Sequence, residues 1–366
     1  MPSPDIKWEE SESYNVGVDL SMWQNRFTAS VDLYLRDTRD LLVRVPIAGS
    51  SGLDVGPMSN AASVRNKGID ISLGYNGSIG KDFRYSVSGV FGYVHNEVTS
   101  LGKGQPILGG NFQNPESFYA TITQVGSPIG AFYGYVVDKV LSTQAEADAY
   151  NAKFGLTGEN AASPGDLAFK DLDNNNTIDD NGDRTIIGNS IPKYTYGFNI
   201  NLYYKQFDFS IGGAGVAGVD IYNNFNHILD AMKYTSNAST DVLKRWRKEG
   251  DVTSVPRATS SDPNRNNRMS DRYISSGNYL KIRNITLGYT FRFKENKYFD
   301  NIRVYTSVQN AFCFTNFEGY DPELGASSSM GAGDAMSYNL QRNIAGQMNN
   351  FPTPRTYLLG VQIAFK

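Results

Sequence analysis

The sequence has 366 residues, a formal net charge of −3 and an isoelectric point near 5.6, so it offers no basic surface for nucleic acid. No run approaches about eighteen consecutive apolar residues, which excludes a transmembrane helix. Aromatic residues reach 13%, with 23 Tyr and 20 Phe beside 36 Gly, a composition that suits many strands and turns.

Short stretches of strictly alternating apolar and polar residues recur along the whole chain. In the first, Val16, Val18 and Leu20 alternate with polar or small residues, and in the last Val361 and Ile363 do the same. Side chains alternate between the two faces of a strand, so each stretch predicts a strand with one apolar and one polar face. The nine predicted strands cover residues 15–22, 27–36, 69–76, 83–93, 194–204, 207–211, 285–293, 302–309 and 354–366.

The connections between these strands are alternately short and long. The long ones cover about Asp37–Asn66, Glu97–Lys193, Ala217–Gly277 and Asn316–Thr353. The second contains a predicted helix at about residues 144–154, with a capping box at its start and a glycine after its end. A hairpin hidden in the third would add two strands. Tight turns alternating with long loops are typical of outer-membrane β-barrels, whose strands escape the test for apolar helices.

The odd number of strands favours the interpretation that this chain is one part of a larger barrel. If the last strand runs towards the periplasm, the first does too, and the N-terminus lies on the outer side. Complete bacterial barrels have an even number of strands, so this parity predicts further sequence upstream. The lack of a secretory signal after Met1 agrees with it. The expected fold is all-β, about 9–11 antiparallel strands from the C-terminal part of a barrel with long extracellular loops.

Eight short motifs occur in order along the chain: Asn66–Asp70, Gly165-Asp166, Ile187–Asn189, Pro192–Tyr194, Asn278–Tyr289, Val308–Phe312, Gly319–Glu323 and Pro354–Tyr357. This ordered set resembles the SusC/RagA family of TonB-dependent outer-membrane transporters. The resemblance implies a 22-stranded barrel in the cell outer membrane, filled by an N-terminal plug and importing glycans or peptides. It also implies a SusD-like surface lipoprotein as a lid, and TonB acting through a box ahead of the plug.

The domain prediction that follows is a single unit. Residues 1–366 are interpreted as the C-terminal part of a TonB-dependent receptor β-barrel in contact with outer-membrane lipid. The plug, the TonB box and the signal peptide are absent from this sequence, so the TonB complex would act only through the missing plug half. The chain would then contribute barrel wall and outer loops to nutrient uptake.

Two other interpretations stay open. One is a soluble, β-rich glycan-binding module with a calcium loop, which would hide its apolar rows in a common core. The other is a stand-alone porin or adhesin barrel, which would have an even number of strands and both termini in the periplasm.

A possible calcium loop stands in the second long connection. Carboxylate, amide and hydroxyl oxygens at alternate positions match offsets 1 to 9 of a calcium loop. Asn176 replaces the usual turn glycine, Gly182 replaces the final bidentate Glu, and Asp183 follows one step later. The alternative is a solvated Asx-rich turn. No cofactor is required, and calcium is the one that the sequence suggests, with Asp171, Asp173, Asn175, Thr177 and Asp179 as its ligands.

Aromatic residues in the long connections are candidates for stacking on sugars or packing against a lid. Packing within the loops themselves is the alternative. These residues are Phe112, Tyr119, Tyr133, Phe317 and Tyr320.

Two further segments invite interpretation. Gly212–Gly218 lacks the Lys-Ser/Thr of a phosphate loop, so close backbone approach within the wall is favoured over nucleotide binding. Leu243–Lys248 is a basic cluster that could contact a partner or lipopolysaccharide phosphates, with a solvated loop helix as the alternative.

The cysteine, the two histidines and the carboxylates outside the possible calcium loop show no pattern typical of a catalytic or metal site. Cys313 is the only cysteine, which excludes an internal disulfide, and its neighbours Phe312 and Phe314 predict a buried, unreactive thiol. His95 and His227 show neither metal-ligand spacing nor a nearby nucleophile signature. No paired catalytic carboxylates stand in a fixed frame, so we expect no enzyme.

Overall fold

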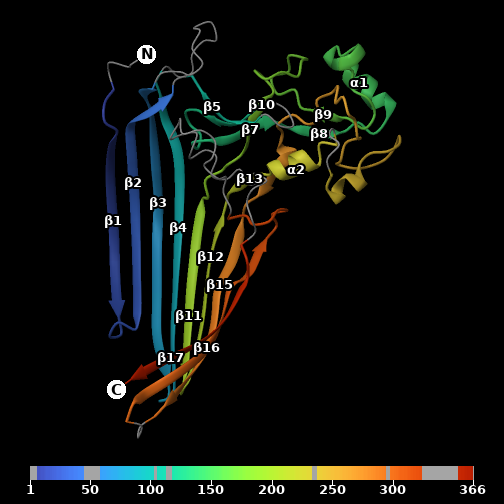
Figure 1. Ribbon diagram of the computed structural model, residues 1–366. Coiled ribbons are helices and arrows are strands. Elements are labelled where there is room, and N and C mark those ends of the chain that lie inside the picture. Colours follow the sequence, from blue (N-terminus) through green and yellow to red (C-terminus); the bar gives the residue numbers. More distant parts are fainter. Residues whose placement is uncertain are drawn as a thin grey trace.

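The computed structural model describes residues 6–44, 58–102, 105–112, 118–232, 237–293, 297–323 and 353–365 (Figure 1). The predicted connections 37–66, 97–193, 217–277 and 316–353 each fall partly outside the described residues. Within the described ranges, no helix is long and apolar enough to cross a membrane.

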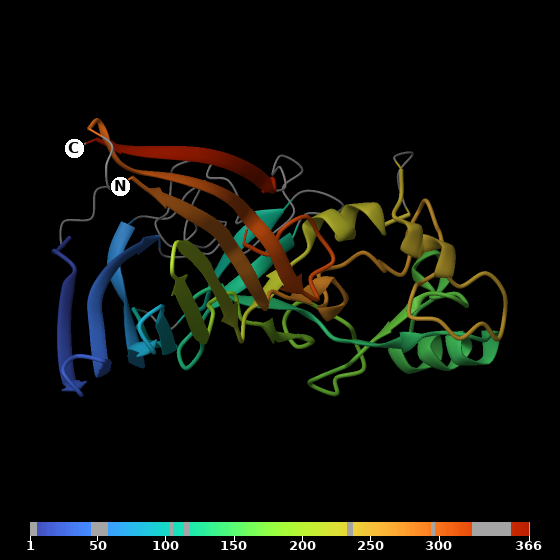
Figure 2. The same ribbon diagram turned by 90° about the horizontal axis from the view of Figure 1, so that it is seen from below.

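Nine long strands form one antiparallel sheet, as the sequence predicts. Each strand pairs with the next long strand along the chain, and β1 and β17 are the two edges, so the sheet is open. Figure 2 shows that the sheet is strongly curved. In sheet order the strands are β1 (Glu10–Met22), β2 (Phe27–Arg44), β3 (Met58–Ile79), β4 (Phe83–Leu101), β11 (Tyr194–Tyr204), β12 (Phe207–Ala217), β15 (Tyr279–Arg292), β16 (Phe299–Thr315) and β17 (Thr356–Phe365).

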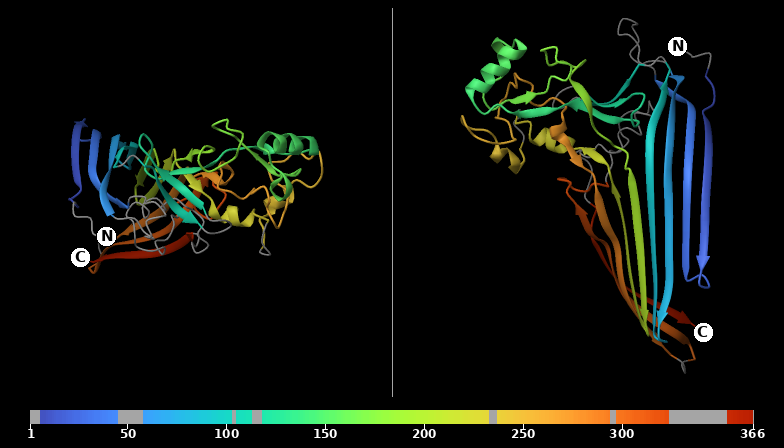
Figure 3. Two further views of the ribbon diagram at one scale, coloured as in Figure 1. Left: turned by 90° about the horizontal axis from the view of Figure 1, so that it is seen from above. Right: turned by 180° about the vertical axis from the view of Figure 1, so that it is seen from behind.

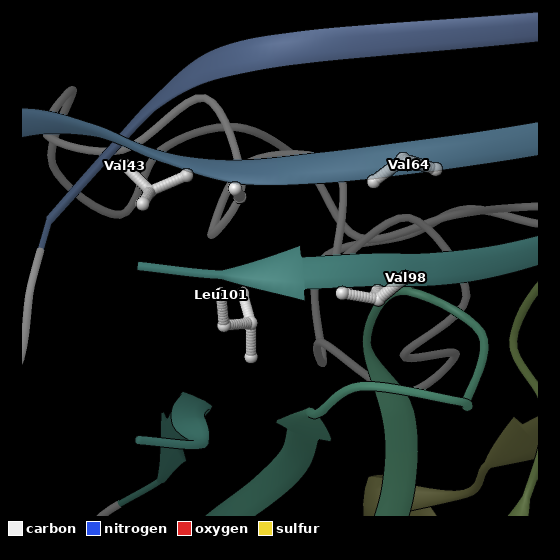
Figure 4. Close-up of a cluster of buried hydrophobic side chains, with 5 residues drawn as sticks. Val43, Val64, Val98 and Leu101 are labelled. Carbon is white, nitrogen blue, oxygen red and sulfur yellow. The ribbon is translucent and has the colours of Figure 1, made fainter. Parts of the chain in front are cut away.

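Seven of the nine strands, all but β11 and β17, extend beyond their predicted bounds, and β2, β3 and β4 do so at their upper ends. Part of the connection 37–66 is strand, and β4 continues past Glu97. The alternation is lost there because the register shifts, beside Asp40 in β2 and Ser63 in β3, while the pairing itself goes on. These upper ends are instead held by a small apolar cluster (Figure 4) of Val43, Ala62, Val64, Val98 and Leu101.

The two long connections on either side of the β11–β12 hairpin fold into shorter elements. We call their described residues within 105–193 and 218–278 the outer unit; it extends sideways beyond the tops of β12 and β15 (Figures 1 and 3). Its strands are β5 (Ile107–Phe112), β6 (Phe118–Thr123), β7 (Ala131–Tyr135), β8 (Val137–Val140), β9 (Leu167–Phe169), β10 (Arg184–Gly188), β13 (Asp220–Tyr222) and β14 (Ile274–Ser276). Its helices are α1 (Gln144–Phe154), α2 (Asn224–Leu229) and the 3-10 turns η2 (Gly158–Asn160), η3 (Thr240–Lys244) and η4 (Asp271–Tyr273).

Helix α1 begins and ends as predicted. The Thr143 hydroxyl accepts a hydrogen bond from the Glu146 backbone N–H, and the Glu146 carboxylate accepts one from the Ser142 N–H. At the other end Gly155 adopts the left-handed conformation, with φ 62°. The capping signals alone therefore located this helix within an irregular stretch.

The possible hidden hairpin does not join the wall. β13 and β14 pair only with each other, as a separate two-stranded sheet. The long sheet of the described residues thus keeps nine strands.

Candidate functional site

The two faces of the long sheet differ in polarity. Residues paired across a ladder point to the same face, so the register defines rows that cross all nine strands. One row consists of Met22, Phe27, Tyr75, Val87, Ile200, Ile211, Ile285, Val308 and Tyr357. The row beside it consists of Ser21, Thr28, Gly74, Ser88, Asn199, Gly212, Asn284, Gln309 and Thr356.

The apolar face lies open rather than packed. Val16, Phe207, Val361 and Phe365 are all exposed, at 50% or more of their surface. No second layer of the described residues covers them, although such rows usually mark a buried face. The apolar side chains of this face are therefore free to contact apolar surroundings outside the described residues.

The polar face carries ion pairs and small residues. Arg303 donates to the Asp208 carboxylate at 2.9 Å and to the Gln362 side chain at 3.1 Å, which links three strands. Cys313 lies on this face opposite Lys281 and is exposed. The prediction of a buried thiol was therefore wrong, because the neighbouring phenylalanines occupy the other face.

Gly213 explains the glycine-rich end of β12. A side chain there would come within 2.7 Å of the Phe198 ring on the neighbouring strand, so glycine leaves room for that ring. The favoured interpretation, close approach within the wall, is confirmed for this position.

A buried charge cluster ties the start of the last long connection to the wall. A bulge at Arg283 shifts the register of β15 and places Lys281 on the polar face. Only 8% of the Lys281 side chain is exposed, and its Nζ lies 2.7 Å from both the Asp321 and the Glu323 carboxylates. Burial alone would raise the pKa of Asp321, but hydrogen bonds from Lys281 and the Glu323 N–H outweigh it and lower that pKa. In the sequence these residues belong to two separate family motifs, and no spacing rule predicts that their side chains meet.

A second buried charge joins the two halves of the outer unit. Asp166 is fully buried and accepts two hydrogen bonds from Arg257, 2.7 and 3.2 Å long. It also accepts from the Asn266 side chain and the Ser163 N–H, both at 2.8 Å. Trp246 donates from its ring nitrogen to the Ser142 carbonyl at 3.2 Å. The two long connections therefore form one folded body.

His227 is a structural residue of this body. It is fully buried, stacks on Tyr273 at 3.8 Å, and contacts the Tyr222 hydroxyl and the Asn267 carbonyl, both at 2.6 Å. Since a carbonyl only accepts, Nε2 carries the proton and Nδ1 accepts from Tyr222. Burial lowers the pKa of His227 to about 3, so the ring is neutral at physiological pH.

The predicted calcium loop brings three carboxylates together. Asp171, Asp173 and Asp183 each offer an oxygen within 4.8 Å of the others. In the sequence Asp183 stands one residue beyond the last ligand position of a calcium loop. Asn176 has φ 60°, the left-handed conformation that a turn glycine would supply and that Asn tolerates. A side chain at Gly182 would meet the Asp173 carboxylate at 2.0 Å, which explains why no glutamate stands there.

The other predicted ligands bond within their own turn. The Asn175 side-chain oxygen accepts from the Thr177 N–H at 2.7 Å, and the Asp179 carboxylate accepts from the Asn181 N–H at 2.7 Å. Lys153 lies 3.3 Å from Asp171; burial would raise the pKa of that carboxyl, but bonds from Lys153 and the Asn176 N–H lower it. Calcium binding here stays a prediction, with Asp183 as an added candidate ligand.

The predicted aromatic contacts lie in different environments. Arg184 donates to the carbonyls of Tyr119 and Tyr133 and stacks over the Tyr133 ring at 4.4 Å, so it brings these two residues together. Phe317 is buried against Ile221, which is packing within the structure. Tyr320 is 68% exposed. The side chain of Phe112 lies outside the described residues.

A cavity of about 550 Å³ opens between α1 and the strands β8 and β9. Its lining includes Lys153, Phe154, Phe169 and Lys170, and none of the predicted aromatic contacts. Its residues come from three elements, so periodicity along the sequence gives no signal for it.

Comparisons with known proteins give a consistent picture. The family model for the β-barrel of TonB-dependent receptor-like proteins matches residues 1–217. TonB-dependent receptor P3 of Formosa agariphila is 30% identical over 369 residues, covering 99% of this chain and 34% of that protein. TonB-dependent receptor SusC of Bacteroides thetaiotaomicron is 27% identical, covering 99% of this chain and 32% of that protein.

A likeness of fold extends to solved structures. The structure of the RagAB peptide transporter superposes with a TM-score of 0.74 at 22% identity, covering 98% of this chain and 36% of that one. The chain thus spans about a third of the length of the relatives that it matches.

Proposed function

Because this chain belongs to the TonB-dependent receptor-like β-barrel family, we propose that it forms wall and outer loops of an outer-membrane importer of glycans or peptides. The sequence resemblance to SusC/RagA transporters is confirmed at the level of the family. The domain assignment of residues 1–366, with plug and TonB box elsewhere in the protein, belongs to the same proposal.

The single observation that carries this proposal is the polarity of the two rows crossing all nine strands. A lipid bilayer solvates an open apolar face, and the interior of a transporter is polar. Unpaired backbone groups cost several kcal/mol each in lipid, so the edges of β1 and β17 need neighbouring strands in the membrane.

The open apolar face weighs against one alternative, and the free edges of the sheet weigh against the other. A soluble glycan-binding module would cover this face with a second layer, as in a β-sandwich. A stand-alone porin would close its sheet, whereas these nine strands have two free edges.

The partners follow from the proposed transporter. A SusD-like surface lipoprotein would cover the outer side, and the TonB complex would engage the plug half. The exposed Tyr320 and Tyr119, together with the half-buried Tyr133, would contact substrate or lid, since accessible aromatic rings suit both sugars and protein surfaces. We propose no enzymatic activity.

Fractionation of cells that express the full-length receptor tests the assignment. We expect the receptor in the outer-membrane fraction, extracted only by detergent and bringing the surface lipoprotein with it. Recovery in the soluble fraction as a folded monomer would overturn the proposal.

Uptake measurements test the aromatic contacts. Labelled oligosaccharide and oligopeptide mixtures should identify the substrate class, and Tyr320→Ala should reduce uptake several-fold. Tyr298→Ala is the matched control, because Tyr298 is also 68% exposed but lies in the turn between β15 and β16. Equal uptake by both variants would remove Tyr320 from the site.

A further inference from the structure

We propose that the segment Leu243–Val252 of the outer unit binds the phosphate-bearing head groups of the outer leaflet. This inference rests on the proposed function, which places the sheet in the outer membrane. We call this segment the basic segment.

Its cationic charge is not neutralised by its own acids. Arg247 donates to the Leu243 carbonyl at 2.9 Å and Arg245 to the Val242 carbonyl at 3.1 Å, bonds that leave the guanidinium charges in place. Arg247 and Lys248 are exposed.

Basic residues outnumber acids within the segment: Lys244, Arg245, Arg247 and Lys248 stand against Glu249 and Asp251. Asp251 accepts from the backbone N–H groups of Arg247 and Lys248, at 3.0 and 3.1 Å. Glu249 accepts from the Gln144 N–H at 3.0 Å, and Asp241, just outside the segment, pairs with Lys244 at 2.6 Å. Backbone hydrogen bonds leave these carboxylates charged, so the four cations and two anions give the segment a net positive charge for an anionic partner.

Large apolar side chains flank these cations. Leu243 is 63% exposed and Val252 97%, the highest value of any large apolar residue in the described ranges. The Thr253 hydroxyl donates to the Lys244 carbonyl at 2.7 Å, which holds the two ends of the segment side by side. Exposed apolar side chains among Lys and Arg are the pattern of a membrane-interface segment rather than of a purely solvated loop.

The segment is rigid and suitably placed. Trp246 anchors it through its N–H to the Val255 carbonyl at 3.0 Å and through its ring nitrogen to Ser142. Figures 1 and 3 show it on the lower side of the outer unit, towards the strands, and Figure 2 shows it displaced sideways from the sheet. A membrane around the strands would present its head groups to that side.

The test uses full-length receptor purified from outer membranes with its partner. Binding of bisphosphorylated lipid A is compared with binding of the same lipid after removal of its phosphates. We expect roughly fivefold weaker binding for each cation removed, so about 25-fold for Arg247→Gln with Lys248→Gln. Lys170→Gln, an exposed lysine elsewhere on the outer unit, should bind like the unchanged protein.

Three results would overturn the inference. The first is that the double variant binds bisphosphorylated lipid A as tightly as the unchanged protein. The second is that the unchanged protein binds the dephosphorylated lipid as tightly as the bisphosphorylated one. The third is loss of the co-purified lipoprotein while lipid binding stays, which would make the segment a protein interface. The single variant Lys248→Gln serves if the double variant folds poorly. A receptor absent from the outer membrane altogether would instead contradict the proposed function.

Discussion

The long sheet and the outer unit are stabilised in different ways. In the sheet, neighbouring strands pair over most of their length, and side chains face either of two environments. In the outer unit, buried polar groups join distant segments; Asp166 and Arg257 are 91 positions apart. The sheet is thus specified by local periodicity, while the outer unit depends on a few side chains whose partners lie far along the chain.

The largest effect should follow from removing the buried carboxylate of the outer unit. Asp166→Ala leaves Arg257 without its partner and should destabilise the unit by about 3–5 kcal/mol. Hydrogen exchange in the full-length receptor should rise in residues 141–170 and 255–267 and stay unchanged in the nine strands. Asp138→Ala, at an exposed position of the same unit, is the control. An equal rise in hydrogen exchange in the outer unit and in the nine strands would contradict the idea that the two regions are stabilised separately.

A positive charge should destabilise the sheet much more on the apolar face of β3 than on its polar face. Leu73→Arg puts a cation on the apolar face and should cost about 2–4 kcal/mol in lipid. Ser72→Arg, one residue away, points to the polar face near Asp70 and should cost far less. Unfolding in lipid vesicles, followed by denaturant titration, measures both. Equal penalties would mean that the faces do not meet different media.

Acidification should loosen the outer unit and spare the sheet. His227 has a folded pKa of about 3 against 6.5 unfolded, so its contribution is complete above pH 6.5 and decreases as the pH falls towards 3. At pH 5 the loss is about 2 kcal/mol. Hydrogen exchange of α2 at pH 7 and pH 5, corrected for intrinsic rates, checks this. His227→Gln should abolish the pH dependence; the same slope in that variant would assign it to another group.

Calcium should give the smallest effect. At about ten times its dissociation constant, the ion should stabilise the loop 171–183 by about 1.4 kcal/mol. Protection of this loop from exchange, with and without calcium, is the measurement. Asp173→Asn should remove the effect, and Asp138→Asn should keep it. Equal protection by magnesium, or none by calcium, would leave the alternative of a solvated turn.

The sheet could be predicted from the sequence, and the contacts of the outer unit largely could not. Alternation located all nine strands, and β11 was predicted to the residue, because each strand shows its faces locally. It failed where bulges shift the register, as at the upper end of β2. For the loops, capping located α1, but no spacing rule pairs Asp166 with Arg257 or Lys281 with Asp321. Such pairs depend on how the strands between them bring the segments together.

The link between Asp166 and Arg257 has a consequence for biogenesis. The hairpin β11–β12 lies between the two segments in the chain, so a ribosome releases Asp166 well before Arg257. Until the second segment has joined the first, the Asp166 carboxylate lacks the cation that pairs with it in the folded unit. In the proposed transporter the outer unit therefore cannot mature hairpin by hairpin along with the wall, because its first half is complete only when the later segment has reached the same side of the membrane.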